Sequence, residues 1–294
     1  MRSGLRYPHI MARVFNRPLL LMPDKADIIG RVLLEREDLA HADLSGIVIL
    51  TDGDEPKMVS ERGADIERDG YFVKDEIAVI PICGTLVHKL GGVRPYSGML
   101  GYDSIRTNYI AALKDEAVEG ILLDVDSPGG EVAGCFDLVD ALYAAREIKP
   151  VRAAVNELCG SGAMAIASIA PRITIARTAL AGSIGVYFLH ADFSEAYDKL
   201  GVKFTIIKDG DLKGQGLSEF PLSDEAFDRI QKQVRDTGTI FKNTIARNRG
   251  IAVKRVIDQQ AAVFMGEEAV AEGLADEIMP IDQAFAEFRS DLGH

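Results

Sequence analysis

The chain has 294 residues, 47% of them hydrophobic and 27% charged, which is ordinary for a globular protein and long enough for a large domain with an extension. Aspartate and glutamate (45) outnumber lysine and arginine (33), giving a formal net charge of −12 without any dense cationic run. This balance argues against nucleic acid as the main partner, because phosphate binding needs clustered cations.

Neither membrane insertion nor metal binding is indicated. No apolar run reaches the roughly 18 residues that cross a bilayer, and the apolar stretch at 17–23 is far too short. The N-terminus lacks the apolar core of a secretory signal. Three cysteines stand in no CxxC or Cys/His pattern, which predicts reduced thiols, no metal and no cofactor. We expect a cytoplasmic protein.

The first 70 residues differ from the rest of the chain. They mix short apolar stretches with charge runs, and a helix is expected around 25–36, followed by a loose link. We interpret residues 1–70 as an N-terminal extension and residues 71–294 as the main domain.

From residue 77 onward, predicted strands and helices alternate. Asp103 is the expected N-cap of the first helix. The run at 120–125 is apolar except for Asp124, as in a strand buried on both faces. The expected strands are 77–82, 120–125, 151–156, 172–176 and 203–208, and the expected helices are 103–114, 131–147, 161–170, 193–200 and 223–247. Repeated strand–helix units predict an α/β fold with a mainly parallel sheet and flanking helices.

Ser161 stands between Gly160 and Gly162 directly after a predicted strand. At the first turn of a helix its hydroxyl would point into a cleft, and the flanking glycines would leave room for a peptide carbonyl. An N-cap serine between turn glycines is the alternative.

The sequence Asp-Ser-Pro-Gly-Gly at 126–130 follows the buried strand. A turn of this kind exposes backbone N–H groups, and Gly130 and Gly162 are the predicted donors of an oxyanion hole. A tight turn leading into the next helix is the alternative.

Lys213 lies in a glycine-framed loop and is the predicted general base, while Ser183, in Gly-Ser-Ile-Gly-Val, would orient it by a hydrogen bond. A lysine accepts a proton only when its amine is neutral, a state that burial favours. Taken alone, Lys213 is an ordinary loop lysine and Ser183 a turn serine. Cys159 is expected to pack behind the site.

Together these segments resemble the signal peptide peptidase A (protease IV) family of serine peptidases, and in particular its phage capsid protease branch of the lambda protein C type. The resemblance covers roughly residues 77–279 and includes Asn-Glu-Leu-x-x-Ser ending at Ser161 and Gly-Glu-Glu-Ala at 266–269. The stretch at 7–20 is similar to the opening of phage-encoded members.

The resemblance implies a ClpP/crotonase-like fold with Ser161 as nucleophile, Lys213 as base and Ser183 as its orienting partner. It places Gly129 and Met164 at the substrate-binding surface, although many relatives carry an aromatic residue at the position of Met164. It also implies a ring-like homo-oligomer in which subunits complete one another's sites.

The predicted function is a serine endopeptidase that forms an acyl-enzyme and cleaves capsid scaffold or portal-type proteins. A cytosolic housekeeping peptidase that degrades signal peptides, and a catalytically silent capsid assembly protein, are alternatives. A Ser/His/Asp mechanism would need His88 or His190, neither of which stands in such a motif. A crotonase-type acyl-CoA enzyme would have little use for Ser161 and Lys213.

Overall fold

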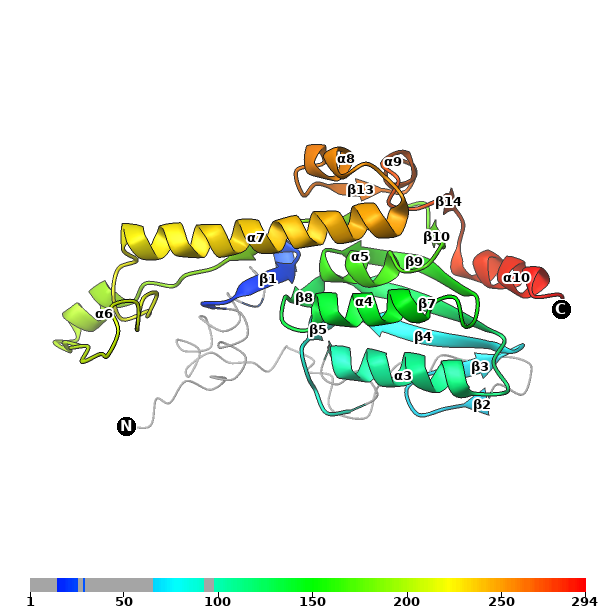
Figure 1. The fold of residues 1–294 in the computed structure, drawn as a ribbon, viewed down its shortest axis with the longest axis horizontal. Coiled ribbons are helices and arrows are strands. Elements are labelled where there is room, and N and C mark those ends of the chain that lie inside the picture. The colour runs from blue at the N-terminus through cyan, green and yellow to red at the C-terminus, as the bar shows by residue number, and fades with distance from the viewer. Residues whose placement is uncertain (1–14, 26–28, 30–65, 93–97) are drawn as a thin grey trace, which may run out of the picture.

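The computed structural model describes residues 15–25, 29, 66–92 and 98–294 (Figure 1). The predicted helix at 25–36 lies mostly outside these residues, as does most of the predicted N-terminal extension. The boundary at residue 70 therefore stays a prediction, although one short piece of the extension pairs with the main domain, as described below.

The larger of two sheets has the strand order β13-β11-β9-β7-β4-β3-β2, with β10 pairing β9 and β14. All neighbours from β4 through β7 and β9 to β10 and β11 run parallel, and so do β10 and β14. The strands are β2 (Ile66–Glu67), β3 (Phe72–Lys74), β4 (Ile77–Cys83), β7 (Gly120–Ser127), β9 (Val151–Gly160), β10 (Arg172–Ile175), β11 (Leu180–Gly182), β13 (Val263–Met265) and β14 (Glu277–Ile278). The predicted α/β fold with a mainly parallel sheet is confirmed.

A smaller sheet has the order β12-β1-β8-β5-β6. Its strands are β1 (Pro18–Leu21), β5 (Thr85–Val87), β6 (Met99–Gly101), β8 (Gly129–Glu131) and β12 (Tyr187–Phe188). β1 comes from the N-terminal stretch and lies between β12 and β8, antiparallel to both. It connects the two parts of this sheet.

Helices cover both faces of the larger sheet (Figure 1). Alternate residues of β4 separate the faces: Ile80 belongs to the main core, whereas Ile77 packs in a second cluster with Phe288. This explains why the central strands are mostly apolar. The helices are α3 (Tyr102–Lys114), α4 (Cys135–Ala145), α5 (Gly162–Ala167), α6 (Ser194–Lys199), α7 (Asp224–Arg249), α8 (Val253–Asp258), α9 (Glu267–Ala271) and α10 (Ile281–Asp291).

The longest helix, α7, begins where the sequence predicts. The Ser223 hydroxyl accepts a hydrogen bond from the Ala226 N–H at 3.2 Å and caps the first turn. Phe241 and Ile245 enter the main core, and Asn248 donates to the Ser168 hydroxyl beyond α5 at 2.9 Å. The N-terminal half of α7 extends beyond the body of the domain (Figure 1).

Three local predictions are wrong. Residues 203–208 form no strand and are exposed, because no other strand of the described chain lies beside them. The helix expected from residue 131 begins at Cys135, because residues 129–131 pair with β1 and β5 instead. Asp103 does not cap α3: its carboxylate accepts hydrogen bonds from the N–H groups of Leu90 and Gly91, and Gly101 takes the cap position.

One carboxyl group on β7 makes the stability of the protein depend on pH. Asp124 accepts a hydrogen bond from the Asn156 amide at 3.2 Å, yet burial raises the pKa of Asp124 to about 6, with nearby Asp126 adding to the rise. The folded protein therefore holds a proton on Asp124 that the unfolded chain releases from about pH 4 upward. Stability falls as the pH rises through the window between about 4 and 6.

We predict that Asp124→Asn removes this dependence. Relative to wild type, the variant should gain on the order of 2–3 kcal/mol as the pH rises from about 4 to 7, since an amide cannot ionise. Urea unfolding of both proteins at several pH values measures the difference. Asp228→Asn, an exposed change of the same charge on α7, is the control. Parallel pH profiles for wild type and Asp124→Asn would contradict the prediction.

Candidate active site

Ser161 lies at the junction between β9 and α5, as the sequence predicts. Its backbone has φ 51° and ψ −112°, a conformation that costs a non-glycine residue about 1–3 kcal/mol and is common at functional sites. The Ser161 N–H donates to the Gly182 carbonyl of the adjacent strand β11 at 2.8 Å, which holds the turn in place. The side chain is 1% exposed, and its hydroxyl has no hydrogen-bond partner among the described residues.

The predicted oxyanion donors lie beside this junction. A Cβ built on Gly162 would be 3.5 Å from the Gly130 nitrogen, and one on Gly129 would be 2.8 Å from the Gly162 nitrogen. Gly129 itself has φ 90°, and its N–H donates to the Ser127 hydroxyl at 3.2 Å. The structure thus brings Gly129, Gly130 and Gly162 together at the residue after β9, leaving no space for side chains between their backbones.

Ser183 follows directly after the residue that binds the Ser161 N–H. It is 7% exposed, has φ 55°, and its N–H donates to the Ala262 carbonyl at 2.9 Å. The preceding Gly182 pairs with Gly160 across the β11–β9 ladder. Ser161 and Ser183 therefore stand at the ends of two neighbouring parallel strands.

Behind the nucleophile position, Cys159 and Met164 are both fully buried, with their sulfur atoms 3.8 Å apart. Burial raises the pKa of the Cys159 thiol, as expected for an unreactive core cysteine. The expected packing of Cys159 behind the site is confirmed. Met164 belongs to the main core rather than to an open pocket.

Lys213 is not brought to Ser161 within one chain. It lies exposed in the turn between α6 and α7, where its N–H donates to the Gly210 carbonyl at 3.1 Å. This turn lies near the start of α7, whereas α5 packs against the C-terminal half of that helix (Figure 1). The 26 residues of α7 span about 39 Å, so the two predicted members of the dyad lie toward opposite parts of a long helix.

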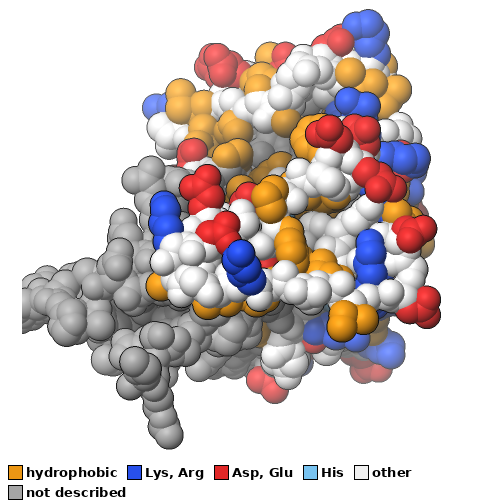
Figure 2. Space-filling model, turned by 90° about the vertical axis from the view of Figure 1, so that its left-hand side faces the viewer, with side chains coloured by type: hydrophobic (Ala, Val, Ile, Leu, Met, Phe, Trp, Pro, Cys, Tyr) orange, Lys and Arg blue, Asp and Glu red, His pale blue; other side chains and the backbone are white. Residues whose placement is uncertain are grey.

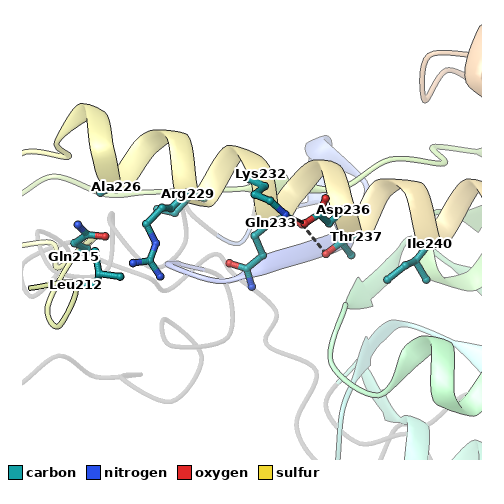
Figure 3. Close-up of a pocket in the computed structure, with 10 residues that line it drawn as sticks. Leu212, Gln215, Ala226, Arg229, Lys232, Gln233, Asp236, Thr237 and Ile240 are labelled. Atoms are coloured by element: carbon teal, nitrogen blue, oxygen red, sulfur yellow. Dashed lines mark hydrogen bonds and ion pairs between the residues drawn. The ribbon is translucent and has the colours of Figure 1, made fainter. Parts of the chain in front are cut away.

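A groove of about 600 Å³ runs along α7 between Ala226 and Ile240 (Figure 3). Leu212 and Gln215 of the Lys213 turn line one end, and Ile240 lines the other. Arg229, Gln233 and Thr237 point into it from α7 (Figure 3). The glycines and serines at the end of β9 do not contribute to this groove, and it is a separate feature of the surface.

Neither candidate histidine contacts Ser161. His190 Nδ1 lies 3.1 Å from the Asn16 amide oxygen, and His88 is exposed beside Gly134. The described residues also contain no group of three or more His, Cys, Asp or Glu side chains arranged to hold a metal ion.

Sequence reasoning missed that β1 borders the site. The Leu20 carbonyl oxygen would be 3.4 Å from a Cβ on Gly162 and would overlap one on Gly129. The Tyr102 hydroxyl, which donates to the Glu131 carbonyl at 2.7 Å, also lies against Gly162. In the sequence, the apolar run at 17–23 was the signal for this strand. Its length was used only to show that it is too short to span a membrane.

Comparison with known proteins places this geometry in a family. The family model "Peptidase family S49" matches residues 144–293. Capsid assembly protease C of Escherichia phage lambda is 36% identical to this chain, over 99% of the chain and 68% of that protein. The chain belongs to peptidase family S49. This confirms the predicted family and, at the level of a peptidase, the predicted enzyme class.

Other S49 relatives cover the chain to different extents. Head-tail preconnector protein GP5 of Enterobacteria phage P21 is 38% identical, over 97% of the chain and 57% of that protein. Protease 4 of Haemophilus influenzae is 26% identical, over 73% of the chain and 34% of that protein. The chain therefore spans only part of the length of each relative.

Two solved structures are similar to this S49 chain over most of its length. A Legionella pneumophila protein described as an enoyl CoA hydratase/isomerase (crotonase) has a TM-score of 0.45 at 14% identity, over 75% of this chain and 74% of its own. A ClpP1 variant of Listeria monocytogenes has a TM-score of 0.43 at 11% identity, over 69% and 91%. Among the described residues, no helix has the length and apolar character needed to span a membrane.

The packing at Gly129 gives a testable prediction. Gly129→Ala places a methyl group against the Leu20 carbonyl and within 2.8 Å of the Gly162 nitrogen, at a positive φ. Overpacking should destabilise the protein by about 1–3 kcal/mol beyond the backbone cost. Gly91→Ala is the matched control, because Gly91 has φ 79° and nothing within 4 Å of its Cβ position. Urea unfolding compares the two, and equal losses would contradict the packing argument.

Proposed function

We propose that the chain is a serine endopeptidase that uses Ser161 as nucleophile and Lys213 as general base. The observation that carries this proposal is the strained Ser161 junction, which buries an unpartnered hydroxyl beside the amides of Gly130 and Gly162. Residues are held in such conformations only where the surrounding structure over-determines them, which is frequent at active sites.

The proposed chemistry has two steps. Ser161 Oγ attacks the scissile carbonyl, while Lys213 takes the hydroxyl proton and returns it to the leaving amine, giving an acyl-enzyme. The N–H groups of Gly130 and Gly162 stabilise the oxyanion in both tetrahedral intermediates. Water then attacks the acyl-enzyme while Lys213 takes its proton; the bond to Ser161 Oγ breaks, Lys213 returns the proton to that oxygen, and the product acid is released. Ser183 orients the lysine amine from the neighbouring strand end.

Because Lys213 is distant from Ser161 in its own chain, we propose that a neighbouring subunit supplies it. The segment between α6 and α7 projects from the domain and exposes several apolar side chains to solvent: Leu200, Val202, Phe204, Ile206, Ile207, Leu212 and Leu217. Ile207 is 97% exposed. Figure 2 faces this end of the molecule and shows apolar side chains among charged ones on its surface. Exposed apolar surface of this kind marks interaction sites.

The natural substrate is proposed from the relatives. The two phage proteins compared above are named as a capsid assembly protease and a head-tail preconnector protein. We propose that this chain is a capsid maturation protease that cleaves scaffold or portal-type proteins. Its place of action would be the host cytoplasm or the procapsid, and its assembly a homo-oligomeric ring.

The first experiment compares wild type with Ser161→Ala and Lys213→Ala on unfolded casein, with cleavage followed by mass spectrometry. Only wild type should cleave, because each variant lacks one proton-transfer partner. A loss of about 10⁴-fold or more is typical when a member of such a unit is removed. Equal background in all three proteins would favour an assembly protein without catalysis. Melting temperatures serve as the check on folding.

Mixing the two inactive variants tests the shared site. After co-expression, Ser161 from a Lys213→Ala subunit can meet Lys213 from a Ser161→Ala neighbour. With random assembly, about a quarter of the sites should be complete, and activity should return to that level. Sites contained within one subunit would stay inactive in every mixture, and that result would reject the shared arrangement while leaving the dyad intact.

A further inference from the structure

β1 fills a gap one strand wide in the smaller sheet. It pairs with β8 through Leu19, Leu20 and Leu21, and with β12 through Pro18 and Leu19. No pairing joins β8 directly to β12. Without β1, two strand edges would therefore face each other across a slot that accepts an extended peptide by main-chain hydrogen bonds on both sides.

The register places one carbonyl of β1 at the predicted oxyanion position. The Met22 N–H donates to the Pro128 carbonyl at 3.0 Å. Because hydrogen-bonded pairs alternate along an antiparallel ladder, Leu20 and Gly130, two residues further along each strand, form the next such pair. The Leu20 carbonyl thus faces the Gly130 N–H, and it lies against Gly129 and Gly162 as well.

Contacts on both sides of this position hold the segment in the slot. Arg17 forms an ion pair with Glu131, the last residue of β8, at 3.1 Å, and the Glu131 carboxylate is 5% exposed. Asn16 donates from its backbone to the Leu189 carbonyl and from its side chain to the Ser218 hydroxyl, both at 2.9 Å. At the other end, Met22 packs so closely on Gly160 that a Cβ there would be 2.6 Å from its sulfur.

The three leucines are buried on alternating sides. Leu20 is fully buried in the main core, which also contains Met164. Leu19 and Leu21 are 2% and 3% exposed and form a separate small cluster, whose partly buried neighbours are Phe15, Ile29 and Tyr187. An extended apolar segment therefore fits the slot in side chains as well as in backbone. It lies against Gly160 and Gly162, on either side of Ser161, whose hydroxyl is inaccessible to solvent.

We propose that residues 17–22 are an internal occupant of the peptidase cleft, with the Leu20 carbonyl held where a substrate presents its scissile carbonyl. The segment must leave before a protein substrate can pair with β8 and β12. The substrates that replace it are extended segments with consecutive apolar side chains. This inference rests on the proposed function of Ser161.

Weakening the segment is the first test. Leu19→Asp places a charge in the small cluster that Leu19 and Leu21 form with their partly buried neighbours. This cluster is separate from the main core, which the substitution leaves intact. Hydrolysis of fluorescein-labelled casein should rise roughly tenfold, because an internal competitor lowers the fraction of open sites. Ile148→Asp, which changes a 66% exposed isoleucine after α4, is the matched control and should leave the rate unchanged.

Locking the segment is the second test, and it remains decisive if Leu19→Asp does not fold. Pro18 and Phe188 are opposite each other in the β1–β12 ladder, within the range that a disulfide spans. The double variant Pro18→Cys/Phe188→Cys should lose casein hydrolysis on oxidation and regain it with dithiothreitol. Wild type, whose cysteines are Cys83, Cys135 and Cys159, is treated identically as the control.

Full activity in the oxidised double variant, with the disulfide verified by mass spectrometry, would overturn the proposal. It would mean that β1 is a permanent strand of the sheet, which can be cross-linked without any effect on hydrolysis. Adding Ser161→Ala to each variant separates this result from a failure of the proposed function. If hydrolysis persists without the Ser161 hydroxyl, the serine mechanism is wrong. If it depends on Ser161 and ignores the lock, only the internal occupant is wrong.

Discussion

The close approach of backbones at the glycines around Ser161 is the constraint on which the site depends. Side chains at Gly129, Gly130 or Gly160 would overlap the main chain or Met22, so these positions admit only hydrogen. The parallel strands β7 and β9 end at the same edge of the sheet and deliver these glycines together. The hydrogen bond from Ser161 to Gly182 adds β11 to the same corner. A strained turn is held because three strands fix it.

Much of the fold and part of the site could be predicted because their signals are local. Mostly apolar runs identify β4 and β7, and a serine followed by acidic residues identifies the start of α7. Glycines flanking a serine after a strand identify the β9–α5 junction. Each of these signals depends on residues within a few positions of one another, so no knowledge of distant partners is required.

The wrong predictions concern features that depend on residues far apart in the sequence. β8 is a strand only because β1 and β5 pair with it, and β1 begins more than a hundred residues earlier in the chain. Residues 203–208 have the composition of a strand, but no described strand pairs with them, so their apolar pattern does not predict their structure. The distance of Lys213 from Ser161 likewise follows from the position of the segment before α7, which the spacing of the two residues in the sequence does not reveal. Pairing over long distances has no local signature.

The length of α7 has a consequence for the position of Lys213. Its C-terminal half is fixed in the core through Phe241 and Ile245, while its N-terminal half carries the Lys213 turn away from the domain. α7 has no internal proline, the commonest cause of a sharp kink, so its exposed turns continue the direction of the buried half. If the lysine serves a neighbouring subunit, the length of α7 sets the distance between the nucleophiles of the two subunits.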